Sequence, residues 1–365
     1  MSRVLVLNTG SSSLKYRLFD GAETVAKGLV EEVTDHARAL QETFNEISLD
    51  NLDAVGHRVV HGGADFTRPT RIDDDVVRTI ERLIPLAPLH NPANLAGIET
   101  ARKLLPDVPQ VAVFDTAFHS TLPPEASTYA IDMETATANR VRRYGFHGTS
   151  HAYVSRRTAA LLNKDPEHTN VITLHLGNGA SACAVEGGRS VATSMGLSPL
   201  EGLVMGTRSG SLDPAIIFHL HRVGGLSLDE IDELLNKRSG LRGLAGVSDM
   251  REVERRRQQG DEAATLAFDV CTRRIKELVG SYYAVLGRVD AITFTAGVGE
   301  NSAAVRAAAL AGLGALGIEV DADRNAAPER GERVVSSPES RVTVCVVPTD
   351  EELEIATQTR AVLGG

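Results

Sequence analysis

Two turns rich in small residues are the first candidates for binding an anion. They are Asn8 to Ser13 (NTGSSS) and Gly177 to Ser181 (GNGAS). Small residues let backbone N–H groups approach phosphate oxygens closely, and the hydroxyls add further donors. Lys15 lies two residues beyond Ser13, so both side chains share one face of the strand expected after the first turn. A single turn of this kind is typical of an ordinary hairpin, whereas two at matching places predict a phosphate clamp.

Two arginines lie in loops of small residues. Arg58 belongs to GHRVVHGG at 56–63, and Arg208 belongs to MGTRSG at 205–210. An arginine between an apolar strand and glycines is poorly placed for a surface role, and its planar guanidinium suits bidentate contact with a carboxylate or a phosphoryl group. The alternative is a structural ion pair within the domain, and the sequence leaves both interpretations open.

Histidines are frequent near these loops. His147 lies between Phe146 and Gly148, where we expect its imidazole to be aimed into a site and to stabilise charge on a transferred group. Neighbouring carboxylates or cysteines that would support metal ligation by the histidine pairs are missing. The other histidines are therefore interpreted as core or helix-start residues: His57, His61, His119 and His151.

Two carboxylates are suited to Mg²⁺, which prefers one or two carboxylates together with water and phosphate oxygens. Asp115 follows the apolar run 111–114, and the carboxyl end of a strand is the usual ligand side of an α/β sheet. Glu351 lies in the segment PTDEE. Either residue could instead cap a helix, and for Asp350 the helix N-cap is the preferred interpretation. The segment 294–302 (FTAGVGENS) leaves room for a ring or a ribose, a weak signal by itself.

The elements that must position these residues repeat along the chain. Residues 4–20 and 171–187 both consist of an apolar strand, a small-residue turn and a second strand, which predicts a hairpin. Aligned from Val4 onto Val171, Leu7 falls on Leu174 and Gly10 on Gly177. Further strands begin near Asp53 and Asp290, each ahead of a glycine-bearing loop. We interpret this as two similar α/β halves that arose by duplication, packed around a cleft.

Helical periodicity fills the intervals between these strands. In the longest helical segment, one apolar stripe is expected to hold Leu266, Val270, Ile275, Leu278 and Val279. The predicted helices are 75–87, 94–105, 148–162, 228–237, 261–286, 301–312 and 351–363. Strands that alternate with helices indicate an α/β architecture.

Composition limits the classes of protein that fit. A length of 365 residues predicts two domains, or three at most, and a hydrophobic content of 42% suffices for real cores. The net charge of −10 argues against a general nucleic-acid or anionic-membrane binder. Three cysteines fit neither a disulfide framework nor a cysteine zinc site. The start of the chain lacks a long apolar run, so we expect a cytoplasmic protein.

Several separate motifs resemble those of the acetokinase family, within the superfamily of acetate and sugar kinases, actin and chaperone ATPases. The motifs cover nearly the whole chain: VLNTGSSSLKY, GHRVVHGG, APLHNPAN, VFDTAFH, RYGFHGTSH, HLGNGAS, TSMGLSPLEGLVMGTRSG, FTAGVGENS and PTDEELEIA. The stretch from about Gly28 to Leu52 is shorter than in typical members.

The resemblance implies a fold of two similar actin-like (ribonuclease H-like) domains, with mixed sheets flanked by helices and an interdomain active-site cleft. Residues 1–118 plus 352–365 would form the N-terminal domain on the substrate and phosphate side. Residues 119–351 would form the C-terminal domain, which binds nucleotide and dimerises. Family members are homodimers, and the 261–286 helix is a candidate contributor to that interface.

The resemblance also implies roles for the motif residues. The catalytic set would be Arg58, Asp115, His147, Asn178 and Arg208. The acetate pocket would hold Arg58, Val60, Leu89, Phe146 and Pro199. The nucleotide and its phosphates would contact Ser11, Ser13, Lys15, His175, Gly177, Asn178, Gly179, Asp249, Met250, Arg251, Gly297, Val298, Gly299 and Asn301. Asn8, Asp115 and Glu351 would surround Mg²⁺, for which Mn²⁺ could substitute, partly through water.

The implied reaction is reversible, direct in-line phosphoryl transfer from ATP to acetate, giving acetyl phosphate and ADP. A carboxylate titrates at about 4 to 5, so it is a nucleophile at pH 7 without a general base. What the reaction needs is cancellation of charge between two anions, which two arginines, an imidazole and Mg²⁺ would supply. The alternatives are a propionate or butyrate kinase, and a non-kinase actin-like ATPase that forms no acyl phosphate.

Overall fold

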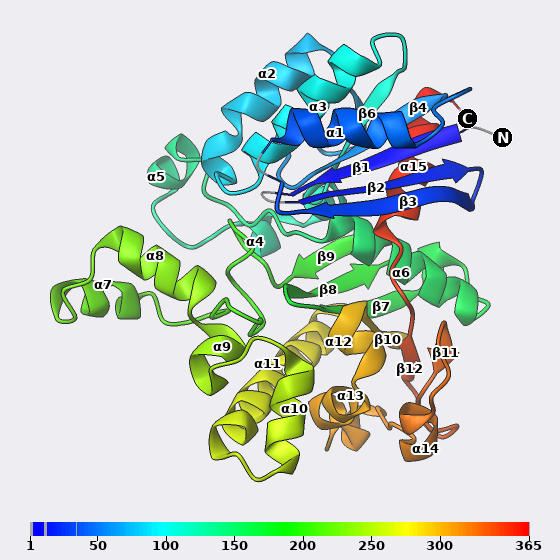
Figure 1. Ribbon diagram of the computed structural model, residues 1–365. Coiled ribbons are helices and arrows are strands. Elements are labelled where there is room, and N and C mark those ends of the chain that lie inside the picture. Colours follow the sequence, from blue (N-terminus) through cyan, green and yellow to red (C-terminus); the bar gives the residue numbers. More distant parts are fainter. Residues whose placement is uncertain (1–2, 11–12, 34, 365) are drawn as a thin grey trace. The chain divides into compact units, whose positions relative to one another are not determined.

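The computed structural model describes residues 3–10, 13–33 and 35–364 and divides into two compact units (Figure 1). Unit 1 consists of Met1–Ser120, Phe146–Tyr153 and Asp350–Gly365, and unit 2 of Thr121–Gly145 and Val154–Thr349. This division differs from the predicted boundaries chiefly because Phe146–Tyr153 belongs to unit 1. The N–H of Gly148 donates a hydrogen bond to the carbonyl of Asp115 at 2.9 Å, which ties this segment to the first unit.

The sheet of unit 1 is mixed, with three parallel strands at its centre. Its strands are β1 (Arg3–Thr9), β2 (Ser13–Asp20), β3 (Glu23–Glu31), β4 (Ala54–Val59), β5 (Thr70–Arg71) and β6 (Gln110–Phe114). Their order is β3-β2-β1-β4-β6-β5, in which β1, β4 and β6 are parallel and the other pairs antiparallel. The carboxyl ends of β1, β4 and β6 therefore meet at one edge of the sheet.

Helices cover both faces of this sheet because β1 is apolar on both sides. Leu5 and Leu7 pack in a core with residues of helices α1 (His36–Glu46) and α3 (Asn91–Leu104). Val4 and Val6 pack on the opposite face against helix α15 (Glu351–Leu363). A third core lies beneath α2 (Asp74–Arg82), which is followed by a 3-10 turn at Ile84–Leu86. Asp350 caps α15, as predicted.

The sheet of unit 2 repeats the topology of the first. Its strands are β7 (Asn170–Leu176), β8 (Ala180–Glu186), β9 (Arg189–Thr193), β10 (Ala291–Thr295), β11 (Arg333–Val334) and β12 (Thr343–Val346). Their order, β11-β12-β10-β7-β8-β9, is the order of the first sheet in reverse. Leu7 pairs with His57 in one sheet, and Leu174 pairs with Phe294 in the other. Both predicted hairpins and the two similar α/β halves are thus confirmed.

The remaining helices follow the chain through unit 2, with α6 beginning in unit 1. They are α4 (Pro124–Ser127), α5 (Met133–Ala138), α6 (Gly148–Leu161), α7 (Ala215–Arg222), α8 (Leu228–Lys237), α9 (Gly240–Ala245), α10 (Met250–Gln258), α11 (Glu262–Leu286), α12 (Ala296–Asn301), α13 (Ala303–Leu310) and α14 (Ala322–Ala326). Three short 3-10 turns lie at Ala117–Thr121, Pro166–His168 and Gly314–Leu316.

Helix α11 corrects the predicted stripe. Ile275 and Val279 are buried as predicted, whereas Leu266 is 56% exposed. Toward the start of the helix the buried face runs through Cys271 and Phe268 instead. The predicted 301–312 helix is observed as the shorter helix α13, since the side chain of Ser302 accepts a hydrogen bond from the N–H of Val305 and caps its start.

The three cysteines, Cys183, Cys271 and Cys345, are buried and free of disulfides. Burial raises the pKa of each thiol to about 12, so these side chains act as small core residues. Among the residues that the structure describes, no helix is both long enough and apolar enough to span a bilayer.

Four histidines of unit 1 lie in its interior as predicted, namely His57, His61, His119 and His151. Burial lowers the pKa of His57 and of His119 to about 4, although a hydrogen bond to Gln110 or to the carbonyl of Phe146 opposes the shift. In the unfolded chain both would titrate near 6.5, so the unfolded state binds more protons between pH 6.5 and 4.

We therefore expect the free energy of unfolding to fall as the pH drops below 6.5. At pH 5 each of these two histidines should account for a loss of about 2 kcal/mol. Urea unfolding at pH 7 and pH 5 measures the loss. The loss should be smaller in His119→Asn and unchanged in His168→Asn, whose side chain is exposed. Equal pH dependence in all three proteins would contradict the assignment of a buried neutral His119.

Candidate active site

Arg58 and Asp115 form a bidentate ion pair at the carboxyl edge of the first sheet. Arg58 Nε lies 2.9 Å from Asp115 Oδ1, and Nη2 lies 2.6 Å from Oδ2. Arg58 is near the end of β4 and Asp115 directly follows the neighbouring parallel strand β6, so the register of the sheet brings them together. Asn8, near the end of β1, accepts a third bond from Arg58 Nη1 at 3.3 Å. Three predicted site residues thus meet at one edge.

Further carboxylates surround this pair. Burial opposes the charge of Arg58, but the negative charges of Asp115 and Glu351 outweigh it and raise the pKa of the guanidinium further above its usual value. Glu351 Oε2 also accepts a hydrogen bond from Thr149 at 3.2 Å, and Glu352 pairs with Lys15 at 2.5 Å. Three carboxylates and two cations leave this corner with an excess of negative charge. That excess favours a further cation.

The donor set fits a hard, partly hydrated cation such as Mg²⁺. Asn8, Asp115 and Glu351 offer only oxygen atoms, the ligands that Mg²⁺ prefers, and their number leaves positions for water and phosphate. Within residues 3–10, 13–33 and 35–364, no group of three or more His, Cys, Asp or Glu side chains is arranged to hold a metal.

The loop before α6 holds His147 in a strained conformation. Its φ of +55° lies in the left-handed region, which costs a non-glycine residue about 1–2 kcal/mol. The neighbouring Gly148 is required because a Cβ there would lie 2.2 Å from the carbonyl oxygen of Asp115. His119 Nε2 further fixes the loop by a 2.9 Å hydrogen bond to the carbonyl of Phe146. Such strain at one residue is common where a side chain must be held for function.

The residues predicted to surround a methyl group differ in burial. Val60 and Phe146 are buried in unit 1, whereas Leu89 is 57% exposed. Pro199 belongs to unit 2, where its carbonyl accepts a hydrogen bond from Arg208.

Two buried asparagines of the APLHNPAN motif, Asn91 and Asn94, were given no role by the sequence analysis. Asn94 accepts a hydrogen bond from the N–H of Val60 at 3.0 Å and donates one to the carbonyl of Thr9 at 2.6 Å. Asn91 likewise holds both backbone polar groups of His61. These amides fix the loop after β4. The signal in the sequence that could have found them is a pair of asparagines three residues apart around a proline.

A cavity of about 960 Å³ in unit 2 brings together eight of the predicted nucleotide residues. It lies at the carboxyl ends of β7 and β10 and at the start of α10. The eight are Gly177, Asn178, Asp249, Met250, Arg251, Gly297, Val298 and Asn301. A Cβ on Gly297 would meet no atom within 4 Å, so this wall is open.

Three other predicted nucleotide residues do not line this cavity. His175 is buried within β7, between β8 and β10, and Gly299 packs against Phe294. Gly179 closes the turn before β8 by accepting a hydrogen bond from the N–H of Gly177. The cavity also has polar lining residues that the sequence analysis did not name: Ser248, Glu254, Arg255, Gln258 and Ser302.

Arg208 is a half-buried cation without a compensating carboxylate in the described part of the chain. Its Nη1 lies 3.1 Å from the carbonyl oxygen of Pro199 and 3.6 Å from Met205 Sδ. Burial lowers the pKa of its guanidinium. The loop is tied to Asn178, since the N–H of Gly206 donates to the Asn178 carbonyl at 3.0 Å and a Cβ on Gly206 would strike the Asn178 side chain. An uncompensated guanidinium is expected where an anion binds.

The loop that carries Pro199 is held by a network that the sequence analysis missed. Arg143 Nη1 reaches the carbonyls of residues 193–195 at 3.1–3.3 Å, and its Nη2 pairs with Glu201 at 2.6 Å. Tyr129 donates to Glu201 and accepts from the N–H of Leu197 at 3.2 Å. Glu201 and Tyr129 also explain Gly196, where a Cβ would lie 2.0 Å from each.

Of the three residues predicted to contact phosphate at the first turn, the structure describes Ser13 and Lys15. Ser11 lies outside the described residues. Ser13 and Lys15 lie on the same face of β2, as predicted, and Lys15 is exposed with its ammonium on Glu352.

Comparisons with known proteins agree with the motifs. The model of the acetokinase family matches residues 32–357. An acetate kinase of Streptomyces avermitilis is 61% identical, over 100% of this chain and 98% of its own length. The crystal structure of Porphyromonas gingivalis acetate kinase superimposes with a TM-score of 0.96 at 43% identity, covering 100% of both chains. A propionate kinase from Francisella tularensis gives 0.93 at 40% identity, over 99% of this chain and 100% of its own.

Proposed function

The chain belongs to the acetokinase family, and we propose that it is an acetate kinase, which transfers the γ-phosphoryl group of ATP reversibly to acetate. One acetate oxygen forms a bond to the γ-phosphorus while the bond from that phosphorus to the β–γ bridging oxygen breaks. The products are acetyl phosphate and ADP. Because acetate is already ionised at pH 7, no protein group has to remove a proton.

The observation that carries this proposal is the uncompensated guanidinium of Arg208. A sugar kinase must deprotonate a hydroxyl group, whereas an acyl-phosphate former must bring two anions together. We assign to Arg208 and Arg58 the acetate carboxylate and the transferred phosphoryl group. His147 and Asn178 donate hydrogen bonds to the developing charge.

The remaining proposed roles follow the same division. Asn8, Asp115 and Glu351 hold Mg²⁺, which when bound neutralises phosphate charge. Adenosine occupies the cavity beside Gly297 and Asp249. Ser11, Ser13 and Lys15 hold phosphate oxygens. The residues proposed for the substrate and those proposed for the nucleotide act on one phosphoryl group. The N-terminal part of the chain carries the substrate role, and the C-terminal part carries the nucleotide role.

Trapping with hydroxylamine tests the proposal directly, because hydroxylamine converts an acyl phosphate to a hydroxamate, which ferric chloride then turns into a coloured complex. With MgATP and acetate we expect hydroxamate to form at the rate of ADP release. Acetate omitted from the mixture is the control. ADP release without hydroxamate would identify an ATPase and contradict the proposal.

The choice between acetate and longer acids depends on the small apolar residues, and the 40% identity to a propionate kinase makes propionate the second candidate. Val60 is buried at the start of the loop after β4. We expect Val60→Ala to raise kcat/KM for propionate over acetate by about 10-fold, since one methylene is worth about 1–3 kcal/mol. Steady-state kinetics on acetate, propionate and butyrate measure it. The control is Val77→Ala, which shortens a half-buried valine on α2. If both variants gave the same ratio of kcat/KM for propionate to kcat/KM for acetate, Val60 would be excluded from the pocket.

Glu201 is proposed as a positioning residue, because it holds the side chains that fix the Pro199 loop. Glu201→Gln should lower kcat about 10-fold with a smaller change in KM for ATP, since a displaced Arg208 loses transition-state contacts first. Kinetic parameters with each substrate varied give the split. Glu332→Gln is the control, since Glu332 accepts a similar pair from Arg157 on the surface. Parallel losses of kcat and of unfolding stability in both variants would indicate a merely structural role.

We also propose that the protein is a cytoplasmic homodimer. Unit 2 exposes several large apolar side chains, among them Ile216 and Phe218 on α7 and Leu266 and Val285 on α11. Apolar side chains gathered on helices are common at interfaces between subunits.

A further inference from the structure

Glu300 belongs to the segment FTAGVGENS but has none of the roles predicted for that segment. It is half-buried on α12, the short helix that follows β10. Gly297, Val298 and Asn301 of the same helix line the cavity proposed for the nucleotide, whereas Glu300 does not. Glu300 therefore lies next to the proposed nucleotide site without forming part of its wall.

The carboxylate of Glu300 joins two backbone segments. Burial raises the pKa of this carboxyl group, and hydrogen bonds from the backbone of Ala296 and of Thr349 oppose the rise. Because both bonds stabilise the charged form, each backbone N–H donates to the carboxylate. Ala296 is the first residue of α12, whereas Thr349 follows β12, the strand parallel to β10. One side chain thus connects the segments that leave two neighbouring strands.

Ala296 has a strained conformation. Its φ of +63° lies in the left-handed region, which is unfavourable for a residue with a Cβ. A conformation of this kind persists only where the surrounding contacts hold it. The hydrogen bond from the N–H of Ala296 to Glu300 is such a contact. The Cβ of Ala296 lies 3.8 Å from the place that a Cβ on Gly177 would take, so the strained turn lies beside another wall of the cavity.

Two arginines fix the backbone of Glu300 itself. Arg306 is 2% exposed, and its Nη1 donates to the carbonyl of Gly299 at 2.9 Å and to that of Glu300 at 3.0 Å. Arg333 Nη2 donates to the same carbonyl of Glu300 at 3.2 Å. Guanidinium groups are favoured at the carboxyl end of a helix, where the last carbonyls lack partners within the helix. The Glu300 carboxylate therefore extends from an anchored backbone and can hold the segments that it contacts.

Helix capping alone does not explain these contacts. The first N–H groups of a helix lack partners within the helix, so an acceptor for Ala296 is expected. That requirement does not account for Thr349, which belongs to no helix or strand. Thr349 is the last residue of unit 2 and comes two residues before Glu351, which is proposed to bind Mg²⁺. The same carboxylate thus also holds the segment that leads to this residue.

We propose that Glu300 is a positioning residue, which holds the turn at 296–298 in the shape that the nucleotide requires. Loss of an acceptor would let the strained Ala296 relax and would move Gly297 and Val298 on the cavity wall. The inference rests on the proposed function, because that function assigns the cavity to the nucleotide. It concerns the nucleotide alone, so acetate binding does not depend on Glu300.

Glu300→Gln tests the inference, because glutamine offers one acceptor oxygen where the carboxylate offers two. We expect the Kd for MgADP, measured by calorimetric titration, to rise about tenfold. We expect kcat/KM for ATP to fall by about the same factor, with KM for acetate unchanged. Equal MgADP affinity in the wild type and in Glu300→Gln would overturn the inference alone. A wild-type protein that does not bind MgADP would overturn the proposed function together with the inference.

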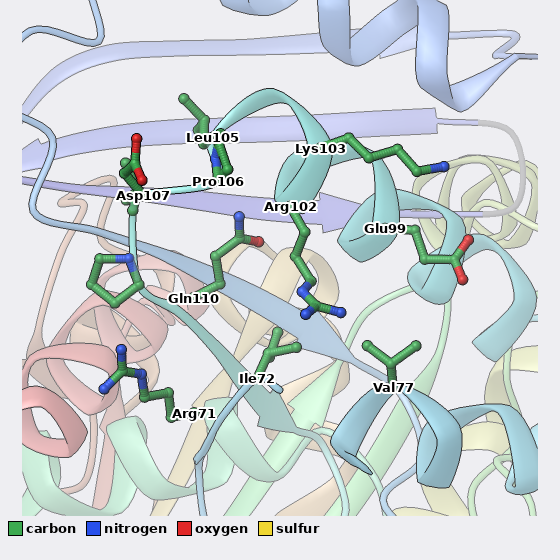
Figure 2. A pocket seen from close by; sticks show the side chains of 12 residues that line it. Arg71, Ile72, Val77, Glu99, Arg102, Lys103, Leu105, Pro106, Asp107 and Gln110 are labelled. Carbon is green, nitrogen blue, oxygen red and sulfur yellow. The ribbon is translucent and has the colours of Figure 1, made fainter. Parts of the chain in front are cut away.

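Two controls separate positioning from a merely structural role. Asp290, directly before β10, also accepts a hydrogen bond from a distant backbone N–H, that of Asn170 at 2.8 Å. Asp290→Asn should therefore lower the free energy of unfolding, as Glu300→Gln does, but leave MgADP affinity unchanged. Glu99→Gln removes a negative charge from the wall of a cavity of about 560 Å³ in unit 1 (Figure 2) and should also leave it unchanged. Equal losses of MgADP affinity in Asp290→Asn and Glu300→Gln would overturn the inference.

A double variant keeps the test decisive if Glu300→Gln folds poorly. Glycine adopts a φ of +63° without strain, so the turn in Ala296→Gly/Glu300→Gln no longer needs the carboxylate. We expect this variant to fold and to bind MgADP within about threefold of the wild type. MgADP binding about tenfold weaker than in the wild type, in a folded double variant, would show that Glu300 does not act through Ala296 and would overturn the inference.

Discussion

Replacing Arg58 by alanine is expected to lower kcat by about 10³-fold or more, the scale of losing an arginine that stabilises a transferred phosphoryl group. It should also destabilise the fold by about 3 kcal/mol, because Asp115 is 1% exposed and would lose its bidentate partner. The pKa of the Asp115 carboxyl, which burial already raises against the opposing charge of Arg58, should rise further. Steady-state kinetics and urea unfolding measure the two losses.

Two variants separate charge from geometry at this position. Arg58→Lys keeps the charge but loses the planar fork, so it should recover stability more than rate. Arg157→Ala removes an arginine with the same bidentate geometry, on Glu332 at 2.6 and 2.8 Å, and should leave kcat unchanged. A folded Arg58→Ala enzyme with wild-type kcat would exclude Arg58 from the reaction.

Arg208→Gln is expected to lower kcat without lowering the free energy of unfolding, in contrast to Arg58→Ala. kcat should fall by about 10²- to 10³-fold, the loss typical of one donor to developing charge. Unfolding stability should stay equal or rise slightly, since no described carboxylate depends on Arg208 and its charge is already disfavoured by burial. A large activity loss without a stability loss distinguishes a group kept for an anionic ligand from a structural ion pair.

The same kinetic and unfolding measurements apply to this variant, and Arg238→Gln, an exposed arginine of unit 2, is its control. A stability loss in Arg208→Gln as large as that in Arg58→Ala would show that Arg208 has a structural partner. Our account of the uncompensated charge would then be wrong.

The fold could be predicted from the sequence because its strongest signals are local. The hairpins begin with runs such as VLVL and VITL, and these apolar runs and the small-residue turns after them are visible without any partner strand. The similarity of the two halves could be predicted from the match of Leu7 with Leu174, and the paired registers confirm that similarity. Glu351–Leu363 was predicted with its observed bounds, because Asp350 and three glutamates mark the start of the helix.

What could not be predicted depends on contacts between distant residues. Leu266 fits a helical stripe in sequence, yet packing places Ala267 and Phe268 inward and leaves Leu266 exposed. The pairing of Arg58 with Asp115 needed the adjacency of β4 and β6, and sequence spacing does not encode strand order. The equivalent of Arg58 in the second sheet is Thr295, so the halves share a fold but differ in site chemistry. The Arg143, Glu201 and Tyr129 network spans 72 residues of sequence and carried no local signal.

The central claim is that Arg58 and Arg208 stabilise the transferring phosphoryl group more than they stabilise bound substrates. Aluminium fluoride with ADP, Mg²⁺ and acetate mimics that planar group, and fluorescence titration gives its affinity for the wild type and both variants. We predict that Arg58→Ala and Arg208→Gln lose affinity for the mimic by nearly the factor by which they lose kcat/KM, while MgADP affinity changes little. Mimic affinity equal to that of the wild type in either variant would contradict the claim for that arginine.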